Sequence, residues 1–310
     1  DTEVIIDVLY APVNPSDLLL AKGVYALKPD LPSVIGGEGI GKVSIIGEKV
    51  LNVKVGDIVN IPFGTFCWSE KVVVESDKLL ALPRDIDLKQ ASMASINPPT
   101  GVLMLNDFPD LKEGDWIAVN AANSAVARSI IAIAKARGIR TLGIVRRDAA
   151  VDPALAAGAD KVIVENESTK SEAEKATANA IIKVGFDAVG GNATNTLARI
   201  LGEESAIVTY AIMSGEPMVL NQIDVIFKKI IIKGFFMYSS TYVDKLKDAY
   251  KASIDLISHG KIDVPIAKIY KPEQIKEAIQ HTIDGGKVLI EFNNSALTND
   301  NIVLSHFKIG

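Results

Sequence analysis

The chain has 310 residues, of which 48% are hydrophobic and 23% are charged, and its formal net charge is −5. This composition is that of a globular protein, and the length favours two domains. The acidic balance and the lack of a dense Lys/Arg run argue against nucleic acid or an anionic membrane as the main partner. No apolar stretch of about 18 residues occurs, so we expect no membrane-spanning helix.

Cysteine and histidine are scarce. The chain contains one cysteine, Cys67, and three histidines, His259, His281 and His306. A zinc site needs three or four such ligands at suitable spacing, and a disulfide needs a second cysteine. The sequence therefore predicts no metal site and no intrachain disulfide, and a reducing compartment is the default.

The first residues, Asp1 to Val8, alternate between polar and apolar side chains as a β-strand does, and no initiator methionine precedes them. We expect the true start of the protein to be absent from this sequence. The protein is then expected to be cytoplasmic by default, or mitochondrial if the absent segment is a transit peptide.

Two kinds of pattern divide the chain. Strand and turn signals dominate residues 1–98, which predicts a β-rich domain. Beyond Asn97-Pro98-Pro99, apolar strand-like runs alternate with helical patterns, which predicts a doubly wound parallel sheet of the Rossmann type in an α/β protein. We expect the Rossmann domain to span 99–261 and residues 262–310 to return to the first domain.

The loop after the first strand of this domain, Asn120 to Ala127, lies where a Rossmann fold carries Gly-x-Gly-x-x-Gly. None of these residues is glycine, but they are small, and Ser124 can cap the next helix or donate to a phosphate. An ordinary β–α turn with an N-cap is the alternative. As a pyrophosphate site, the loop would bind through Asn123, Ser124, Ala125 and Val126.

Two arginines, Arg146 and Arg147, follow the second strand of this domain. NAD sites carry an acidic residue there, whereas NADP sites carry a cation for the 2′-phosphate. Guanidinium groups match phosphate geometry, so the sequence favours NADPH over NADH. Asp148 follows directly, and a solvated arginine pair is the alternative. The next stretch, from Arg147 to Gly158, is shorter than such a connection usually is.

A series of short motifs runs through the chain in a recognisable order. Ala11 to Asp17 is similar to "APINPSD", Pro32 to Gly39 to "P-x-x-G-G-x-E-G", and Asn120 to Ala127 to "N-A-S-N-S-G-V-G". Further matches are Gly23-Val24-Tyr25, Gly64-Thr65, Asn97 to Thr100, Thr209 to Met213, Lys233 to Met237 and Gly286 to Val288. Together these motifs resemble the zinc-free medium-chain dehydrogenase/reductase superfamily, most closely its mitochondrial-type trans-2-enoyl thioester reductases. Asn14 and Gly37 stand where zinc-dependent relatives carry ligands.

The resemblance implies a β-rich GroES-like catalytic domain split around the Rossmann domain, with the active site in the cleft between them. It also implies a homodimer joined through the strand 230–237. It nominates Tyr25 as proton donor, Asn14 as a positioner of carbonyl or nicotinamide, and Trp68 as a pocket wall. Further cofactor-binding residues that it implies are Asn97, Thr100, Tyr210, Ala211, Ile212, Met213, Phe235, Phe236, Met237 and Lys287. A packed tyrosine, an Asn-Pro turn and a core tryptophan are the alternatives for the first three.

The predicted reaction is NADPH-dependent reduction of the C=C bond of a 2-enoyl thioester of coenzyme A or acyl carrier protein, or of a related enal or enone. Hydride would reach the β-carbon, and Tyr25 would supply the proton. One alternative is an NADPH:quinone oxidoreductase, whose acceptor needs no dedicated proton donor. Another is a non-catalytic relative that binds NADPH in a structural or nucleic-acid-binding role.

Overall fold

The computed structural model describes residues 1–108 and 110–292, and the chain divides into two compact units. The first unit comprises residues 1–84 and the chain from 266 onward, and the second comprises residues 85–265. Residues 85–98 and 262–265, which the patterns assigned to the first domain, thus belong to the second unit. The stretch 293–310 lies outside the described residues.

The first unit is built on a mixed six-stranded sheet in the order β11-β12-β1-β2-β3, with β4 also pairing with β1. Its strands are β1 (Glu3–Val13), β2 (Gly39–Ile46), β3 (Ile58–Ile61), β4 (Lys71–Glu75), β11 (Lys268–Tyr270) and β12 (Val288–Glu291). Strand β1 pairs antiparallel with β2, β4 and β12. Alternate residues of β1, namely Val4, Ile6 and Val8, are completely buried because successive side chains of a strand point to opposite faces.

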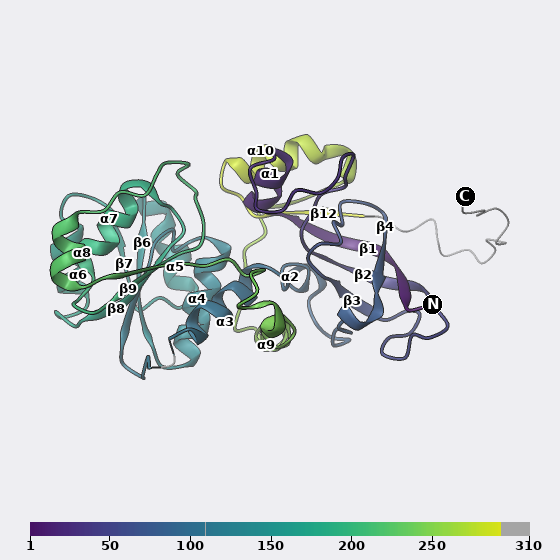
Figure 1. Cartoon of the computed structure of the whole chain (residues 1–310), viewed down its shortest axis with the longest axis horizontal. Coiled ribbons are helices and arrows are strands. Elements are labelled where there is room, and N and C mark those ends of the chain that lie inside the picture. Colours follow the sequence, from purple (N-terminus) through teal and green to yellow (C-terminus); the bar gives the residue numbers. More distant parts are fainter. Residues whose placement is uncertain (109, 293–310) are drawn as a thin grey trace. The chain divides into compact units, whose positions relative to one another are not determined.

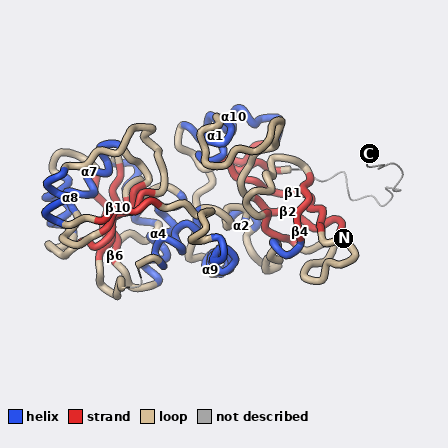
Figure 2. The backbone as a smooth tube through the Cα atoms, in the orientation of Figure 1, coloured by secondary structure: helices blue, strands red, loops and turns tan. Residues whose placement is uncertain are grey.

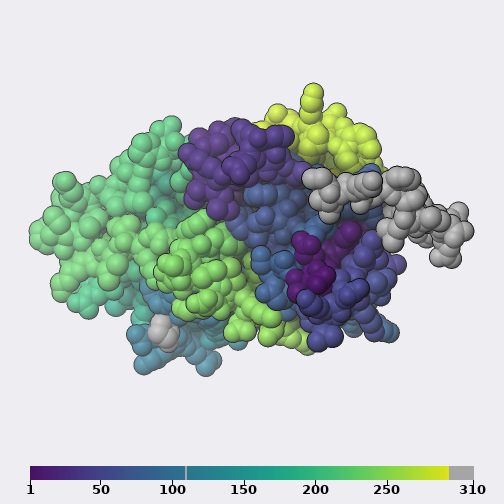
Figure 3. Space-filling model, turned by 45° about the vertical axis from the view of Figure 1, so that its right-hand side comes forward, coloured from purple at the N-terminus to yellow at the C-terminus, as the bar shows by residue number. Residues whose placement is uncertain are grey.

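Two helices of this unit, α1 (Pro15–Ala21) and α10 (Ile275–Ile283), lie side by side although they are distant in sequence (Figure 1). The same neighbourhood is visible on the surface, where purple N-terminal residues adjoin the yellow residues of α10 (Figure 3). Short 3-10 turns, η1 (Ser76–Lys78) and η4 (Pro272–Gln274), complete the unit. The N-terminal and C-terminal parts of the chain are therefore folded into one unit.

The second unit contains a six-stranded parallel sheet in the order β10-β9-β8-β5-β6-β7. Its strands are β5 (Trp116–Val119), β6 (Arg140–Val145), β7 (Lys161–Val164), β8 (Ile182–Asp187), β9 (Ala206–Thr209) and β10 (Ile231–Gly234). All four residues of β5 are buried, as the central strand of a sheet covered on both faces requires. This sheet confirms the predicted doubly wound α/β fold.

The second unit also contains helices, several of which flank this parallel sheet (Figure 2). They are α2 (Leu88–Ala91), α3 (Asn97–Asn106), α4 (Ala125–Ala136), α5 (Val151–Ala156), α6 (Thr169–Ala176), α7 (Gly191–Ile200), α8 (Gln222–Lys228) and α9 (Leu246–Ser258), with 3-10 turns η2 (Asp148–Ala150) and η3 (Val243–Lys245). After β5 the chain builds β6 and β7 on one side and then crosses to β8 on the other. This reversal places the expected ligand site of the sheet at the carboxyl ends of β5 and β8.

Within the described residues, no helix is long and apolar enough to cross a membrane.

Candidate active site

A buried carboxylate at the end of β8 joins the loops that follow β5 and β8. Asp187 is completely buried, and its Oδ1 accepts a hydrogen bond from the Asn120 side-chain amide at 2.7 Å. The same oxygen accepts from the backbone N–H groups of Val189 and Gly190, at 3.0 Å each. The Asn120 side-chain carbonyl in turn accepts from the backbone N–H of Ala188 at 2.8 Å. The edge of the sheet where doubly wound folds bind ligands is therefore fixed by charge-assisted hydrogen bonds.

Helix α4 begins immediately beyond this edge. Ser124 is its N-cap residue, and the serine hydroxyl accepts a hydrogen bond from the Ala127 backbone N–H at 3.3 Å. Asn123 is exposed, and Ala125 and Val126 in the first helical turn are half-buried. The first backbone N–H groups of a helix are donors suited to an anion, so this terminus can hold a phosphate without a glycine-rich loop.

The loop after β9 runs along the loop after β8. The backbone N–H of Tyr210 donates to the Asp187 carbonyl, and that of Met213 donates to the Ala188 carbonyl, both at 3.1 Å. The Tyr210 hydroxyl lies beside Ser124 and makes no well-formed hydrogen bond within the described part of the chain. Burial, and then the charge of Asp187, raise the pKa of that hydroxyl well above its usual value. The protonated phenol of Tyr210 thus lies beside the N-terminus of α4.

The segment after β10 joins the same unit through two contacts. The Thr100 hydroxyl on α3 lies 3.6 Å from the Met237 sulfur, and the Phe235 backbone N–H donates to the Thr209 carbonyl at 2.9 Å. Asn97, at the start of α3, is buried. The predicted cofactor residues of α3 and of the segment after β10 therefore lie in one neighbourhood.

The predicted 2′-phosphate residues follow β6. Arg146 and Arg147 are both exposed, as is Asp148, and Arg147 is the N-cap residue of η2. An exposed guanidinium pair at the end of the second strand is accessible to an anionic ligand. The structure thus presents both arginines where the sequence analysis expected a 2′-phosphate.

Asn14 lies in a buried polar cluster of the first unit, between two charged groups. The Lys287 ammonium, just before β12, donates to Asn14 Oδ1 at 2.6 Å, and Asn14 Nδ2 donates to Glu38 Oε1 at 2.8 Å. Asn14 is 3% exposed and Glu38 is 0% exposed. Because a cation binds the amide oxygen and a carboxylate binds the amide nitrogen, the orientation of Asn14 is fixed. Burial lowers the pKa of Lys287, whereas the nearby carboxylates raise it.

Asp17 and Tyr25 interact in the same unit. Asp17 is buried at the start of α1, and its two carboxylate oxygens accept from the backbone N–H groups of Asn14 and Gly37, at 2.8 Å each. Burial raises the pKa of Asp17 to about 6, although the two hydrogen bonds act in the opposite direction. Tyr25 is half-buried, and burial followed by the Asp17 charge raises the pKa of its hydroxyl. Tyr25 is therefore protonated at neutral pH, as a proton donor must be.

The Trp68 ring covers the turn that carries Gly36. Gly36 has φ +100°, and a Cβ atom there would lie 2.2 Å from Trp68 Cδ1, so only glycine fits. The Trp68 indole N–H also donates to the Pro12 carbonyl at 3.3 Å. Beside it, the buried Cys67 thiol donates to the Glu38 carbonyl at 2.9 Å, and burial raises the pKa of this thiol. Trp68 thus supports the turn, and its role as a pocket wall stays a prediction.

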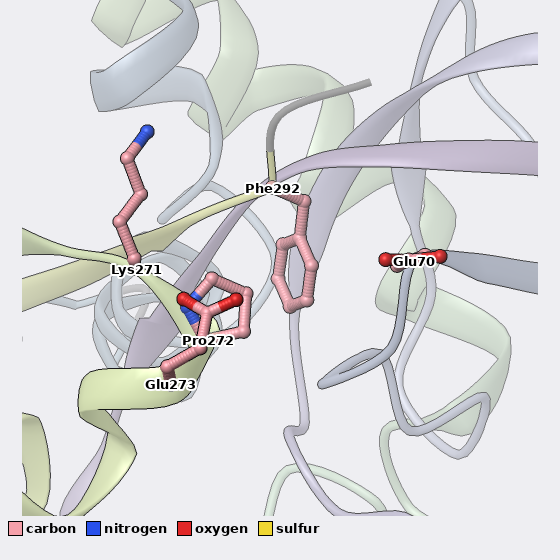
Figure 4. Close-up of a pocket in the computed structure, with 5 residues that line it drawn as sticks. All are labelled: Glu70, Lys271, Pro272, Glu273 and Phe292. Carbon is pink, nitrogen blue, oxygen red and sulfur yellow. The ribbon is translucent and has the colours of Figure 1, made fainter. Parts of the chain in front are cut away.

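A shallow cavity of about 210 Å³ lies elsewhere in the first unit and contains none of the predicted site residues. Glu70, Lys271, Pro272, Glu273 and Phe292 line it (Figure 4). In this view Lys271 and Glu70 lie on opposite sides of the Phe292 ring. The Lys271 ammonium pairs with Glu291 at 2.6 Å. The cavity supplies no group that the predicted reaction needs.

The structure places the predicted residues as two groups, one in each unit. The second unit holds the α4 terminus, the arginine pair, the loop after β9 and the segment after β10. In these loops Ala211 and Phe236 are half-buried and Ile212 is exposed. The first unit holds Asn14, Tyr25 and Trp68 together with Lys287, which the resemblance nominated for cofactor binding and which here contacts the Asn14 amide.

The sequence analysis missed three polar residues. Asp17 follows Asn14-Pro15-Ser16 just before an apolar run, and Asp187 closes an apolar run shortly before Gly190-Gly191; an acidic residue at such a position was the available signal. Arg128 interrupts the apolar pattern of α4, which is also a visible anomaly in the sequence. All three are buried.

Comparisons with known proteins agree with this architecture. Residues 1–84 match the family model described as "Alcohol dehydrogenase GroES-like domain", and residues 125–259 match "Zinc-binding dehydrogenase". Within the described residues, no group of three or more His, Cys, Asp or Glu side chains is placed to hold a metal ion.

Individual relatives indicate the family more narrowly than these family models do. The mitochondrial enoyl-[acyl-carrier-protein] reductase of Dictyostelium discoideum is 33% identical over 93% of this chain and 86% of its own length. The Etr1p complex with NADP and crotonyl-CoA is similar with a TM-score of 0.84 at 25% identity, covering 94% of this chain and 91% of that one; Etr1p is a mitochondrial 2-enoyl thioester reductase of Candida tropicalis. A putative NADPH:quinone reductase of Bacillus thuringiensis has a TM-score of 0.83 at 25% identity, with coverage of 94% and 90%.

A GroES-like unit and a Rossmann unit in this order define an oxidoreductase of the medium-chain dehydrogenase/reductase superfamily. Within that superfamily, the chain belongs to the family of the mitochondrial-type enoyl-[acyl-carrier-protein] reductases. The resemblance found in the sequence motifs is thereby confirmed.

Asp17 generates a prediction about the pH dependence of stability. Its carboxyl has a pKa of about 6 in the folded protein, whereas an aspartate in an unfolded chain titrates near pH 4. The folded state therefore binds more protons between these values, and this contribution to the free energy of unfolding falls as pH rises, by an amount on the order of 3 kcal/mol. The stability advantage of the wild type over Asp17→Asn should accordingly shrink between pH 4 and pH 7 in urea denaturation experiments.

An exposed aspartate of the same unit, Asp77, provides the control. The stability difference between the wild type and Asp17→Asn should change with pH by more than that between the wild type and Asp77→Asn. Equal changes for the two variants would contradict the prediction.

Proposed function

We propose that the chain catalyses NADPH-dependent reduction of the C=C bond of a 2-enoyl thioester, carried on coenzyme A or acyl carrier protein, or of a related enal or enone. One observation carries the proposal: the first unit holds an Asn14 amide fixed within a buried charged cluster and a protonated Tyr25 influenced by the charge of Asp17, and the second unit has a Rossmann anion site. The enoyl-[acyl-carrier-protein] reductase relatives and the complex with NADP and crotonyl-CoA support it.

The residues of the second unit fit a dinucleotide. The backbone N–H groups at the start of α4 would bind the pyrophosphate, and Arg146 and Arg147 would bind the 2′-phosphate. The Tyr210 hydroxyl is a buried donor without a well-formed hydrogen bond in the described chain, and a cofactor oxygen would satisfy it. When bound, NADPH supplies the hydride that adds to the β-carbon of the substrate.

The first unit supplies the proton. Addition of hydride to the β-carbon leaves negative charge on the α-carbon and the thioester oxygen, and the α-carbon must then gain a proton. The Tyr25 O–H bond breaks, a C–H bond forms at the α-carbon, and the tyrosinate recovers its proton from solvent. The transfer is favourable because the α-carbon of a thioester is a much weaker acid than a phenol.

Asn14 would position either the substrate carbonyl or the nicotinamide amide. Its two charged partners, Lys287 and Glu38, hold the amide in one orientation, so no reorganisation is needed when a ligand arrives. The ammonium of Lys287 also offsets the negative charge of Glu38 and Asp17 in the cluster. Asn14 therefore acts in this proposal as a polar group of fixed orientation.

Quinone reduction is the second candidate, because the similar solved structures include the putative NADPH:quinone reductase. A quinone takes its protons from water and requires no dedicated donor. The protonated Tyr25 phenol favours the enoyl substrate, because protonation of the α-carbon needs a donor and quinone reduction does not. A relative that binds NADPH without turnover is the remaining alternative.

Replacement of Tyr25 by phenylalanine separates the candidates. Tyr25→Phe removes the proton donor, so kcat for crotonyl-CoA should fall by about 10²- to 10⁴-fold while NADPH affinity is retained. Reduction of a small quinone should be unchanged. Both rates are followed by NADPH consumption.

Tyr10, a half-buried tyrosine of β1, gives the matched control, and Tyr10→Phe should leave enoyl reduction unchanged. Enoyl reduction that survives Tyr25→Phe would overturn the assigned proton donor. A wild-type protein that reduces only the quinone would favour the second candidate, and cofactor binding without any turnover would overturn both.

Replacement of both arginines after β6 tests the cofactor. The Arg146→Ala/Arg147→Ala variant loses the charged hydrogen-bond donors to the 2′-phosphate, so the Kd for NADPH should rise by about 10- to 100-fold and the Kd for NADH by less than about threefold. Fluorescence titration measures both. Arg199, an exposed arginine on α7, is the control. Equal weakening of NADPH and NADH would contradict the assignment.

We propose that two copies of the chain pair through β10. This strand is an edge of the parallel sheet, and its Ile231 and Ile232 are 64% and 37% exposed (Figure 2). Helix α8 adds the exposed apolar residues Ile223, Ile226 and Phe227 to the same part of the unit. An uncovered apolar edge strand favours pairing with a second strand, and a second copy offers an identical edge.

Ile231→Asp would place charges on both edges of this dimer and should give monomers in sedimentation velocity experiments. Val73→Asp, at a 55% exposed position of β4, is the control and should remain dimeric. A wild-type monomer would overturn the proposal.

The curated relatives are mitochondrial by name, which favours a mitochondrial over a cytoplasmic location for this chain.

A further inference from the structure

Arg128 is a buried cation that the proposed chemistry does not use. It lies on α4, four residues after the Ser124 cap, and only 7% of its surface is exposed. Its guanidinium binds carbonyl oxygens: NH1 donates to the Pro153 carbonyl at 2.6 Å, and Nε and NH2 donate to the Asp263 carbonyl at 3.2 and 2.9 Å. A buried arginine remains charged, and burying a charge costs free energy unless hydrogen bonds compensate it. The hydrogen bonds of Arg128 provide this compensation, and they also link α4 to two other segments of the unit.

The first partner, Pro153, belongs to the segment that carries the predicted 2′-phosphate residues. Helix α5 follows Arg147 after one 3-10 turn and has only six residues, too few for an independently stable helix. Its buried side chains are small: Ala154 is 0% exposed, and Ala150 just before it is 5% exposed. Across the described residues, no other side chain hydrogen-bonds to residues 146–158. Arg128 is therefore the polar anchor of this short segment.

The second partner is itself fixed. Next to Asp263, Val264 forms two backbone hydrogen bonds with the Gln90 side-chain amide, at 2.9 and 3.0 Å. The Arg128 guanidinium thus links the Asp263 carbonyl, whose neighbour Val264 is fixed by Gln90, to the Pro153 carbonyl of α5. Because Arg128 also lies on the helix that begins at Ser124, it sets the position of the Arg146–Arg147 turn relative to the anion-binding N-terminus of α4.

We propose that Arg128 is a positioning residue for the cofactor, which sets the preference for NADPH over NADH by holding Arg146 and Arg147 in place without touching the nucleotide. This inference rests on the proposed function. It also gives a role to the short connection between β6 and β7: its buried residues Ala150 and Ala154 are small, and the guanidinium adds hydrogen bonds to the apolar packing that they share with Ile131.

The test uses two nucleotides that differ only by the 2′-phosphate, adenosine 2′,5′-bisphosphate and 5′-AMP, with the full chain and isothermal titration calorimetry. Arg128→Met should weaken binding of the bisphosphate by about tenfold and that of AMP by less than about threefold. Arg128→Lys, which keeps the charge and one donor direction, should recover part of the loss. Arg137→Met is the matched control on the same helix, because Arg137 is exposed and donates to Asn106; it should change neither affinity.

Three outcomes would overturn the inference. Equal weakening of both nucleotides together with a lowered Tm would show a merely structural role. Unchanged affinities would show that the arginine pair is held by other contacts. Full activity of Arg128→Met, with the ratio of kcat/KM for NADPH to kcat/KM for NADH unchanged, would also show that Arg128 does not set the cofactor preference.

Hydrogen–deuterium exchange without nucleotide separates this inference from the proposed function. The amides of residues 146–158 should exchange faster in Arg128→Met than in the wild type and the Arg137→Met control. Unchanged exchange overturns the anchor, whether or not nucleotides bind. A wild-type protein that binds neither probe overturns the proposed function, and the cofactor preference with it, even where exchange confirms the anchor.

Discussion

The hydrogen bonds of one buried carboxylate organise the second unit. Asp187 receives the Asn120 amide and two backbone N–H groups on a single oxygen. An isolated buried carboxylate would be strongly unfavourable, whereas hydrogen bonds to a charged group contribute about 1.5–3 kcal/mol each. The backbone carbonyl of Asp187 also accepts from Tyr210. Three loops from three parallel strands thus depend on one residue, through its side chain and its backbone carbonyl, for their relative positions.

In the first unit, an ammonium group compensates the charge of buried carboxylates. Its cluster contains two buried carboxylates, Asp17 and Glu38, and one ammonium, Lys287, with the Asn14 amide between the ammonium and Glu38. Hydrogen bonds from backbone N–H groups satisfy both carboxylate oxygens of Asp17. Burial nevertheless raises the pKa of Asp17, because the hydrogen bonds offset its desolvation only in part. The same burial raises the pKa of the neighbouring Tyr25 further, and its phenol is protonated at neutral pH.

Local sequence patterns predicted the fold because the elements of the second unit are defined by their own residues. The run from Trp116 to Val119 is apolar throughout and forms a completely buried strand, and Ser124 caps α4 as its position suggested. The residues at the boundary between the two units were harder to predict. Residues 85–96 contain only the four-residue helix α2, and Gln90 joins the second unit through Val264, 174 positions away in sequence.

The interactions within the candidate site could not be predicted for the same reason. Lys287 reaches Asn14 across 273 positions, and Arg128 reaches Asp263 across 135. The types of residue were visible in the sequence, but the partners were not, because no local pattern encodes a contact over such a separation. Motifs therefore nominated the candidate residues, while charge compensation between them emerged only from the folded chain.

Cys67 has a practical consequence. It is the only cysteine in the chain, it is completely buried, and its thiol has a raised pKa, so thiolate formation is suppressed. Maleimide reagents react with exposed thiolates and should leave the native protein unlabelled. A cysteine introduced at one exposed position would then carry a fluorophore or spin label selectively, without removal of the natural thiol. The chain is thus already suited to spectroscopic measurement of its motions.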